Sequence, residues 1–284
     1  MVQGKSIMVE KAKVVITGAN GMLGYDLADV FSDCELHAFG KEGLDVTDWG
    51  DVKRKFTSIK PDIVLNAAAY TDVDGCELNR DLAVSVNADA VKNMAKVCSA
   101  INATFVQIST DYVFDGRKKG YTENDDKNPI NFYGETKALS EDYVERYADK
   151  YYIIRTSWLF GTHGKNFVET IIKNAREKGI LQVVDDQIGC PTYTYDLAMK
   201  IKSMTDEEFG IYHITNRDSC SWFDFAHEII SLSGIVAVIE PIRSNNIQRP
   251  AKRPRCSILL NTKMEDDMRH WRDALKEYLT KRRK

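Results

Sequence analysis

The feature that most constrains the fold is a glycine-rich turn near the start of the chain. Residues 13–24 read KVVITGANGMLG, in which an apolar run leads through Gly18, Gly21 and Gly24 into a helical pattern. Such glycines let the backbone approach a pyrophosphate, whose charge is held by the free N–H groups at the helix start. A tight turn without a ligand is the alternative, but the flanking strand and helix favour a dinucleotide-binding site.

The first half of the chain alternates short apolar runs with longer amphipathic stretches. Apolar runs without polar alternation indicate strands that are buried on both faces, as in a parallel sheet. We therefore predict an α/β fold, a Rossmann-type doubly wound parallel sheet. The predicted strands cover residues 13–17, 35–39, 62–69, 104–109 and 151–155, and the predicted helices cover residues 22–32, 48–59 (capped by Asp48), 77–100 and 135–149.

The second half is less regular, which predicts a smaller α/β substrate-binding domain built from later segments. We assign residues 1–155 to the dinucleotide-binding domain and expect residues 181–205 to return to it. Residues 156–180 and 206–284 then form mainly the substrate-binding domain. The elements expected here are helices over residues 166–178, 194–204, 222–232 (opened by Ser221) and 271–281, and a strand over residues 181–184.

Composition excludes several classes of protein. The 284 residues include 39 Lys and Arg against 42 Asp and Glu, so the basic excess of nucleic-acid-binding proteins is missing. No apolar run approaches the roughly 20 residues of a membrane span, and residues 1–11 lack the apolar core of a signal peptide, so we expect a cytoplasmic protein. The six cysteines are scattered without metal-ligand spacing, which predicts neither a metal site nor a disulfide framework.

Tyr133 and Lys137 form a Tyr-x-x-x-Lys motif. Residues four apart share one face of a helix, so the phenol and the ammonium would point to one place. A neighbouring cation lowers the pKa of a phenol, which suits a proton donor to a carbonyl that accepts a hydride. The spacing also arises by chance, and the motif gains weight because it follows the fourth predicted strand.

Hydroxyl side chains end that fourth strand, in the run STDYVFDG over residues 109–116. Ligands of such sheets bind at the carboxyl ends of the strands, where Thr110 could polarise a substrate carbonyl. The alternative is that Ser109 and Thr110 only cap the following loop.

In this order, the glycine turn, STDYVFDG and YGETK resemble the extended short-chain dehydrogenase/reductases. The chain is most similar to their dTDP-4-dehydrorhamnose reductase family, from about Lys13 to Lys263. The more specific matching segments are NAAAYTDVDGCE (66–77), VNADA (86–90), RTSWLFG (155–161), DDQIGCPT (185–192) and RPAKRP (249–254).

The resemblance implies an NADH- or NADPH-dependent oxidoreductase with a dTDP-sugar substrate. The implied reaction reduces the C4 keto group of dTDP-4-dehydro-L-rhamnose to give dTDP-L-rhamnose, the last step of dTDP-rhamnose biosynthesis for cell-wall polysaccharide. Tyr133 matches the proton donor, Lys137 the residue that holds the nicotinamide ribose, and Thr110 the third catalytic residue.

Further positions follow from the same resemblance. Asp74 and Glu77 also match family positions, but we interpret them as structural residues. The expected substrate-binding residues are Thr110, Asp111, Trp158 and Arg253. The expected cofactor-binding residues are Gly18, Gly21, Met22, Leu23, Gly24, Asp45, Val46, Ala67, Ala68, Ala69, Tyr70, Asn87, Ser109, Tyr133 and Lys137.

Two charged regions bear on the ligands. After the second predicted strand, Lys41 would favour the extra phosphate of NADPH and Glu42 the ribose of NADH, so both cofactors stay open. Between Pro241 and Leu260 there are five cations and no acid, which suits a diphosphate, although a solvated loop is the alternative. These cations are Arg243, Arg249, Lys252, Arg253 and Arg255.

Two other functions remain open from the sequence. A different nucleoside-diphosphate keto-sugar reductase or epimerase would keep the fold, but an epimerase needs a further acid–base pair, for which Cys190 is a distant candidate. A regulatory subunit would bind the nucleotide without turnover, and the complete set of Thr110, Tyr133 and Lys137 argues against it. A homodimer is compatible with the sequence.

Overall fold

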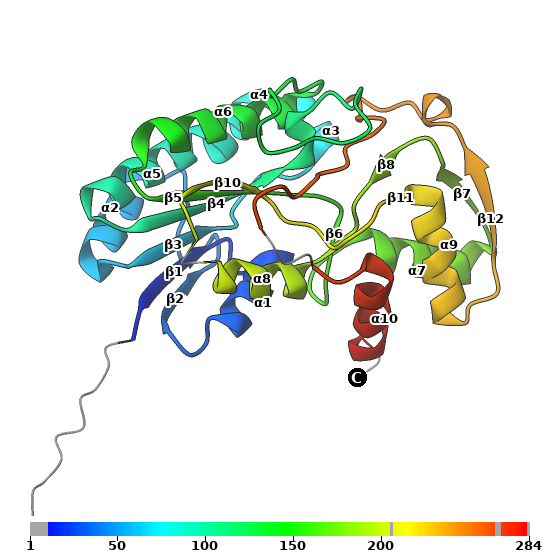
Figure 1. The fold of residues 1–284 in the computed structure, drawn as a ribbon, viewed down its shortest axis with the longest axis horizontal. Coiled ribbons are helices and arrows are strands. Elements are labelled where there is room, and N and C mark those ends of the chain that lie inside the picture. Colours follow the sequence, from blue (N-terminus) through cyan, green and yellow to red (C-terminus); the bar gives the residue numbers. More distant parts are fainter. Residues whose placement is uncertain (1–10, 205–206, 265–267, 283–284) are drawn as a thin grey trace, which may run out of the picture.

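A six-stranded parallel sheet forms the centre of the computed structural model, which describes residues 11–204, 207–264 and 268–282 (Figure 1). The residues that we examined for a signal peptide therefore lie almost entirely outside the described part. The sheet has the strand order β10-β5-β4-β3-β1-β2. Its strands are β1 (Lys13–Thr17), β2 (Glu35–Phe39), β3 (Ile63–Asn66), β4 (Thr104–Thr110), β5 (Tyr151–Thr156) and β10 (Gly210–His213).

The strand order reverses at β1, which places the glycine turn at the ligand-binding crevice. β1 pairs with β2 on one side and with β3 on the other, so that Thr17 is aligned with both Phe39 and Asn66. In doubly wound sheets, ligands bind where the strand order reverses, outside the carboxyl ends of the strands. The predicted fold class is confirmed.

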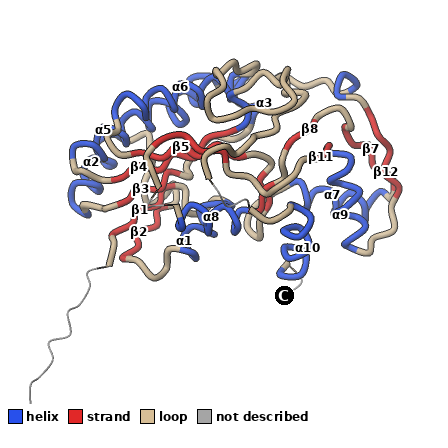
Figure 2. The backbone as a smooth tube through the Cα atoms, viewed as in Figure 1, coloured by secondary structure: helices blue, strands red, loops and turns tan. Residues whose placement is uncertain are grey.

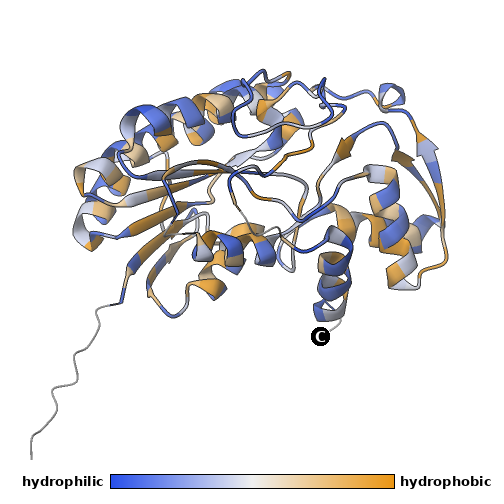
Figure 3. Ribbon diagram, in the orientation of Figure 1, coloured by the Kyte–Doolittle hydropathy of each residue, from blue (hydrophilic) through white to orange (hydrophobic). Residues whose placement is uncertain are grey.

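Helices cover both faces of the sheet, which explains the continuous apolar runs of the strands. On β1, Val14 and Ile16 pack in the core beneath α1 and α8, whereas Val15 packs in the core beneath α2, α5 and α6. Figure 1 shows these two layers, and in Figure 3 the covering helices carry both hydrophilic and hydrophobic residues. The helices are α1 (Met22–Val30), α8 (Thr194–Ser203), α2 (Trp49–Ile59), α5 (Ala90–Ala100) and α6 (Phe132–Tyr147).

A separate apolar core lies beside the sheet, while the division of the chain into two domains stays a prediction. It contains Phe225 and Trp271, both fully buried, and is built from later segments of the chain. Figure 2 shows its helices beside a short pair of strands. Its elements are α7 (Phe167–Lys178), α9 (Trp222–Ser233), α10 (Trp271–Lys281) and the paired strands β7 (Ile180–Val184) and β12 (Val238–Ile242).

Two pairs of two-residue strands join the sheet to this second core. β6 pairs with β9, and β8 pairs with β11 in an antiparallel arrangement. Their bounds are β6 (Leu159–Phe160), β9 (Thr192–Tyr193), β8 (Ile188–Gly189) and β11 (Cys220–Ser221).

Most predicted elements are confirmed, and one helix is wrong. Instead of a single helix over residues 77–100, the chain forms α3 (Val73–Leu78), α4 (Arg80–Val84), a π-helical turn (Ser85–Asp89) and α5. Asp72 caps α3 through the Gly75 N–H, and Asn79 interrupts the helix with a non-helical backbone.

The sequence did not predict β10 or β12. β10 lies in the segment assigned mainly to the substrate domain, yet it forms the edge of the central sheet. β12 contains Pro241, so the cation-rich segment over residues 241–260 begins inside a strand. Two predicted caps are confirmed, because Asp48 accepts from the Asp51 N–H and Ser221 forms a capping box with Asp224.

The six cysteines all lie in the described residues, and each is a free thiol. Within residues 11–204, 207–264 and 268–282, no three His, Cys, Asp or Glu side chains are grouped as a metal ion would need. None of the helices in this described part combines the length and apolar character that crossing a membrane requires.

Candidate active site

Two adjoining cavities lie at the carboxyl ends of the central strands. The Tyr133 cavity, of about 440 Å³, is lined by Tyr133, Lys137 and the ends of β4 and β5. The Asp45 cavity, of about 500 Å³, is lined by Asp45, Lys41 and other residues that follow β2. Both cavities are also lined by Gly21 and by Ala67–Ala69, so together they form one crevice that extends from β2 to β5.

The glycine turn is built so that no side chain could be added to two of its glycines. Gly18 has a φ of +71°, and a Cβ atom there would lie 2.5 Å from the backbone nitrogen of Ala68. A Cβ atom on Gly24 would lie 2.2 Å from the carbonyl oxygen of Gly18. α1 begins after Gly21 with no side-chain cap and no acid in its first turn. The turn therefore fits a pyrophosphate, which the free N–H groups of α1 would bind.

In the Asp45 cavity, the charged residues after β2 are placed unequally. Lys41 lines the cavity, whereas Glu42 does not. Asp45 accepts hydrogen bonds from the backbone N–H and the hydroxyl of Thr47, at 3.0 and 2.7 Å, and these lower the pKa of its carboxyl. The cavity thus offers one cation and one ionised acid to the adenosine end of a dinucleotide.

Asn87 lies in neither cavity, although the resemblance placed it among the cofactor-binding residues. It is fully buried in the π-helical turn, where its amide accepts from the Tyr70 N–H at 2.8 Å and donates to the Tyr70 carbonyl at 3.0 Å. It also donates to the Thr136 hydroxyl of α6 at 3.1 Å. These contacts point to a positioning role, in which Asn87 holds the chain after β3 against α6.

A buried polar chain, which sequence reasoning missed, lies beneath the crevice. The Thr17 hydroxyl donates to the Asn66 side chain at 2.6 Å, and Asn66 donates to Gln107 at 2.7 Å. The same Asn66 oxygen accepts from the Ala68 N–H at 3.2 Å. The chain joins β1, β3 and β4 and fixes the backbone that both cavities share.

The three expected catalytic residues meet in the Tyr133 cavity. Thr110 ends β4, while Tyr133 and Lys137 lie on the first turns of α6. α6 begins at Asn131, whose side chain accepts from the Gly134 N–H at 2.8 Å. A hydrogen bond joins the side chains of Thr110 and Tyr133. One carbonyl oxygen could therefore contact both hydroxyls.

The pKa of Tyr133 differs from our expectation. We expected the ammonium to lower the pKa of the phenol, but burial raises the pKa of Tyr133 above its ordinary value. The hydrogen bond with Thr110 acts in the opposite direction, and Asp111 raises the pKa further. The phenol therefore stays protonated at neutral pH, as a proton donor must.

Lys137 is held beneath the cavity by the backbone of β4. Its ammonium donates to the carbonyl of Ile108 at 2.7 Å, and only 2% of the residue is exposed. Burial lowers the pKa of Lys137 to about 8, while the carboxylate of Glu141 acts to raise it.

Glu141 continues the stripe of Tyr133 and Lys137 at a spacing of four residues along α6. Its two oxygens accept from Arg155 of β5 at 3.0 and 2.8 Å, in a bidentate ion pair that is almost completely buried. Ser109, which we expected to bind the cofactor, lines the cavity but donates its hydroxyl hydrogen to Glu141. The helix is thus anchored to β4 and β5 directly behind Lys137.

Asp111 lies in the wall of the Tyr133 cavity, as expected for a substrate-binding residue. It accepts from the hydroxyls of Thr110, at 3.0 Å, and Ser257. Burial raises the pKa of its carboxyl to about 7, although both hydrogen bonds oppose this shift. Asp111 therefore changes its charge close to neutral pH.

Trp158 also lines the Tyr133 cavity, and its indole is stacked on that of Trp222. The ring centroids are 3.4 Å apart and the planes differ by 6°. Trp158 has an unusual φ of +48°, and a Cβ on Gly189 would lie 2.5 Å from its ring. Sequence reasoning missed Trp222, because only the fold brings the first residue of α9 to this cavity.

Arg253 does not line the Tyr133 cavity but a neighbouring pocket of about 310 Å³, together with Arg249 and Lys252. Its guanidinium forms a bidentate pair with Asp74, with both N–O distances at 3.0 Å. Burial opposes ionisation of Asp74, but the hydrogen bonds from Arg253 and the Ala251 N–H lower its pKa overall. The cation-rich segment over residues 241–260, hereafter the basic loop, contains no acid and is partly neutralised by Asp74 of α3.

The two acids that we interpreted as structural both make structural contacts. Asp74 holds the basic loop, and Glu77 accepts from the Phe132 N–H at 2.8 Å at the start of α6. Asn131 donates to the carbonyl of Lys252 at 2.9 Å. α3, the basic loop and the start of α6 are thus connected.

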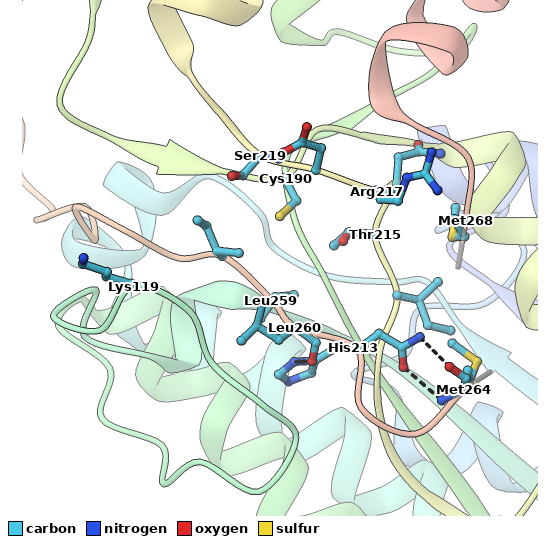
Figure 4. A pocket seen from close by; sticks show the side chains of 15 residues that line it. Lys119, Cys190, His213, Thr215, Arg217, Ser219, Leu259, Leu260, Met264 and Met268 are labelled. Carbon is cyan, nitrogen blue, oxygen red and sulfur yellow. Dashed lines mark hydrogen bonds between the residues drawn. The ribbon is translucent and has the colours of Figure 1, made fainter. Parts of the chain in front are cut away.

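Cys190 lies in another pocket, of about 420 Å³, with His213 and Thr215 (Figure 4). Burial raises the pKa of its thiol to about 12, with the hydrogen bond from Thr215 acting in the opposite direction. A thiol with this pKa and position is poorly suited to exchange protons with a sugar in the Tyr133 cavity, so the structure gives the epimerase reading no support.

Comparison with known proteins identifies the family. The family model of the RmlD substrate binding domain matches residues 12–284. The chain belongs to this family. It is 40% identical to a spore coat polysaccharide biosynthesis protein of Bacillus subtilis, over 95% of this chain and 98% of that protein.

Two relatives are dTDP-4-dehydrorhamnose reductases. The enzyme of Aggregatibacter actinomycetemcomitans is 38% identical over 93% of this chain and 97% of its own length. A crystal structure of the Bacillus anthracis enzyme in complex with NADP is 38% identical and superposes with a TM-score of 0.93, covering 95% of this chain and 99% of that chain.

The buried ion pair leads to a stability prediction. Arg155→Met removes the bidentate partner of the buried Glu141 carboxylate, which keeps only the Ser109 hydroxyl and the Lys127 ammonium at 3.5 Å, and should lower the free energy of unfolding by about 3 kcal/mol. The double variant Glu141→Leu/Arg155→Met should recover most of this loss, because no isolated charge remains. Urea unfolding measures both. Arg54→Met, which removes the exposed pair with Asp51, serves as a control that should cost at most about 1 kcal/mol. If Arg155→Met lost no more free energy of unfolding than Arg54→Met, the prediction would be contradicted.

The raised pKa of Asp111 predicts a pH dependence. The folded carboxyl ionises near pH 7 and the unfolded one near its ordinary value of 3.8, so folding takes up a proton between these values. The stability of the wild type relative to Asp111→Asn should therefore be highest below pH 4 and fall as the pH rises to about 7. Urea unfolding at pH 4.5, 6 and 8 tests this.

A suitable control is Asp115→Asn, since the hydrogen bond from Tyr121 lowers the pKa of Asp115 despite the opposing effect of burial. Its stability difference from the wild type should stay flat from pH 4.5 to 8, because a carboxyl with a lowered pKa loses its contribution only as the pH falls below about 4. A flat profile for Asp111→Asn would show that Asp111 ionises normally.

Proposed function

We propose that this protein is an NAD(P)H-dependent reductase that converts dTDP-4-dehydro-L-rhamnose to dTDP-L-rhamnose. The observation that carries the proposal is the meeting of Thr110, Tyr133 and Lys137 in a cavity that shares its wall with the glycine turn. Membership of the RmlD family and relatives that are dTDP-4-dehydrorhamnose reductases support the choice of reaction.

In the proposed reaction, the bound nicotinamide cofactor supplies a hydride for the C4 carbon of the sugar. Tyr133 donates its phenolic proton to the C4 oxygen, so that the ketone becomes an alcohol. With substrate bound, Thr110 would redirect its hydroxyl hydrogen from Asp111 to the same oxygen and stabilise its developing negative charge. Lys137, whose ammonium is held by the carbonyl of Ile108, would hold the ribose next to the nicotinamide.

The substrate would extend from the Tyr133 cavity towards the basic loop. Asp111 and Trp158 would contact the sugar, and the cations beside the neighbouring pocket would bind the diphosphate. Arg249 and Arg253 also act on Tyr112 in the cavity wall, where their charge lowers the phenol pKa against the effect of burial. This proximity supports a continuous substrate site.

A cytoplasmic location and a homodimer stay predictions.

The direct test is the absorbance change of the reduced nicotinamide when the purified protein receives dTDP-4-dehydro-L-rhamnose. A panel of GDP- and UDP-keto-sugars and other dTDP-keto-sugars separates this substrate from its alternatives. Oxidation with dTDP-4-dehydro-L-rhamnose above all others supports the proposal. Cofactor binding without oxidation by any keto-sugar would instead indicate a regulatory subunit.

Tyr133→Phe should lower kcat about 10²- to 10⁴-fold, because the variant keeps the ring but lacks the proton that the alcohol needs. Its dissociation constant for NADPH should change little, as measured by fluorescence titration. Tyr143→Phe, on the same helix but outside both cavities, is the matched control. Unchanged turnover in Tyr133→Phe would exclude it as the proton donor.

Lys41→Ala should weaken NADPH about tenfold and leave NADH unchanged, because only NADPH carries a 2′-phosphate for this cation to bind. Binding of each reduced cofactor can be titrated by fluorescence. Glu42→Ala is the control, as its side chain lies outside the Asp45 cavity. An equal loss for both cofactors would show that Lys41 does not select between them.

A further inference from the structure

Thr156 is a buried hydroxyl residue in the Tyr133 cavity, and no part of the proposed mechanism uses it. It ends β5, lies in register with Thr110 of β4, and is 3% exposed. Within the described residues, its Oγ1 atom has no hydrogen-bond partner. The neighbouring hydroxyls, by contrast, have hydrogen-bond partners. Ser157 donates to the carbonyl of Cys190 at 2.7 Å, and Ser109 donates to Glu141.

An unpaired buried hydroxyl costs stability, and a valine of the same shape would avoid this cost. The packing of β5 therefore gives no reason for a hydroxyl at this position. Since Thr156 lines the cavity, a ligand can supply the missing partner.

The order of the strands indicates which part of a ligand lies there. The Asp45 cavity follows β2, the glycine turn follows β1, and Lys137 contacts the backbone of β4. A dinucleotide with its adenosine at β2 and its pyrophosphate at the glycine turn reaches β4 with its second ribose. The nicotinamide ring then lies at the ends of β4 and β5, where Thr156 is the last residue of its strand.

We infer that the Thr156 hydroxyl hydrogen-bonds the carboxamide of the nicotinamide ring. The inference rests on the proposed function, because it requires a pyridine dinucleotide in this crevice. The carboxamide NH₂ donates to the hydroxyl oxygen of Thr156, which receives no hydrogen bond within the described residues. Holding the carboxamide fixes the rotation of the ring, so that one of its faces points to the carbonyl held by Thr110 and Tyr133. Thr156 is thus a cofactor-positioning residue.

The test compares Thr156→Val, which removes the hydroxyl and keeps the shape, with Thr156→Ser, which keeps the hydroxyl. The dissociation constant of NADPH is measured by fluorescence without any sugar. Thr156→Val should weaken NADPH about 3- to 10-fold, as expected for one hydrogen bond, whereas Thr156→Ser should stay within about twofold of the wild type.

A second arm uses the reduced 3-acetylpyridine analogue of NADPH, which lacks the amide NH₂. The wild type should bind this analogue more weakly than NADPH, and the difference should shrink in Thr156→Val. In the cofactor-free protein, Thr156→Val should melt at the same temperature as the wild type or higher, because the hydroxyl has no partner within the protein.

Three results would overturn the inference. An unchanged NADPH constant with a raised KM for the sugar would assign the hydroxyl to the substrate. A lower melting temperature of cofactor-free Thr156→Val would reveal a structural partner. Equal discrimination against the analogue in wild type and Thr156→Val would exclude the carboxamide. Wild-type binding and turnover are measured separately, so failure of the proposed function is seen there and is not confused with these results.

Discussion

The buried ion pair between Glu141 and Arg155 fixes α6 on the central sheet, and the proposed chemistry depends on that position. Glu141, Lys137 and Tyr133 follow one another at four-residue spacing, so anchoring the first of them to β5 also directs the other two. The pair contributes electrostatically as well, because its carboxylate opposes the loss of charge that burial imposes on Lys137. One contact thus sets the place of the helix and influences the protonation of its lysine.

Local patterns allowed the sheet and much of the site to be predicted from the sequence. The apolar run at Lys13–Thr17 became a strand with the predicted bounds, because a strand buried on both faces has few polar residues. Glu35–Phe39 also has its predicted bounds, although it is the partly exposed edge strand of the sheet. Gly18 and Gly24 were recognised since the turn requires backbone contacts that a side chain would prevent. Spacing along one helix was enough to place Tyr133 and Lys137 in one cavity.

Contacts between distant segments could not be predicted in this way. Trp222 reaches the Tyr133 cavity only because α9 packs beside the sheet, and Asp74 meets Arg253 across 179 positions of sequence. The unpaired hydroxyl of Thr156 is likewise invisible in sequence, because a lack of partners depends on every neighbour in space. Asn87 was placed in the right region but bonds the backbone of Tyr70 instead of lining a cavity.

The contact between Asn131 and the Lys252 carbonyl joins the start of the helix that carries Tyr133 to the basic loop. A nucleotide bound at that loop would therefore help to hold the proton donor in place, even though it takes no part in the chemistry. Binding energy from a remote part of a substrate is commonly used to orient reacting groups. The nucleotide portion of the substrate would then contribute to catalysis as well as to binding. A keto-sugar without it would be bound more weakly and also converted more slowly.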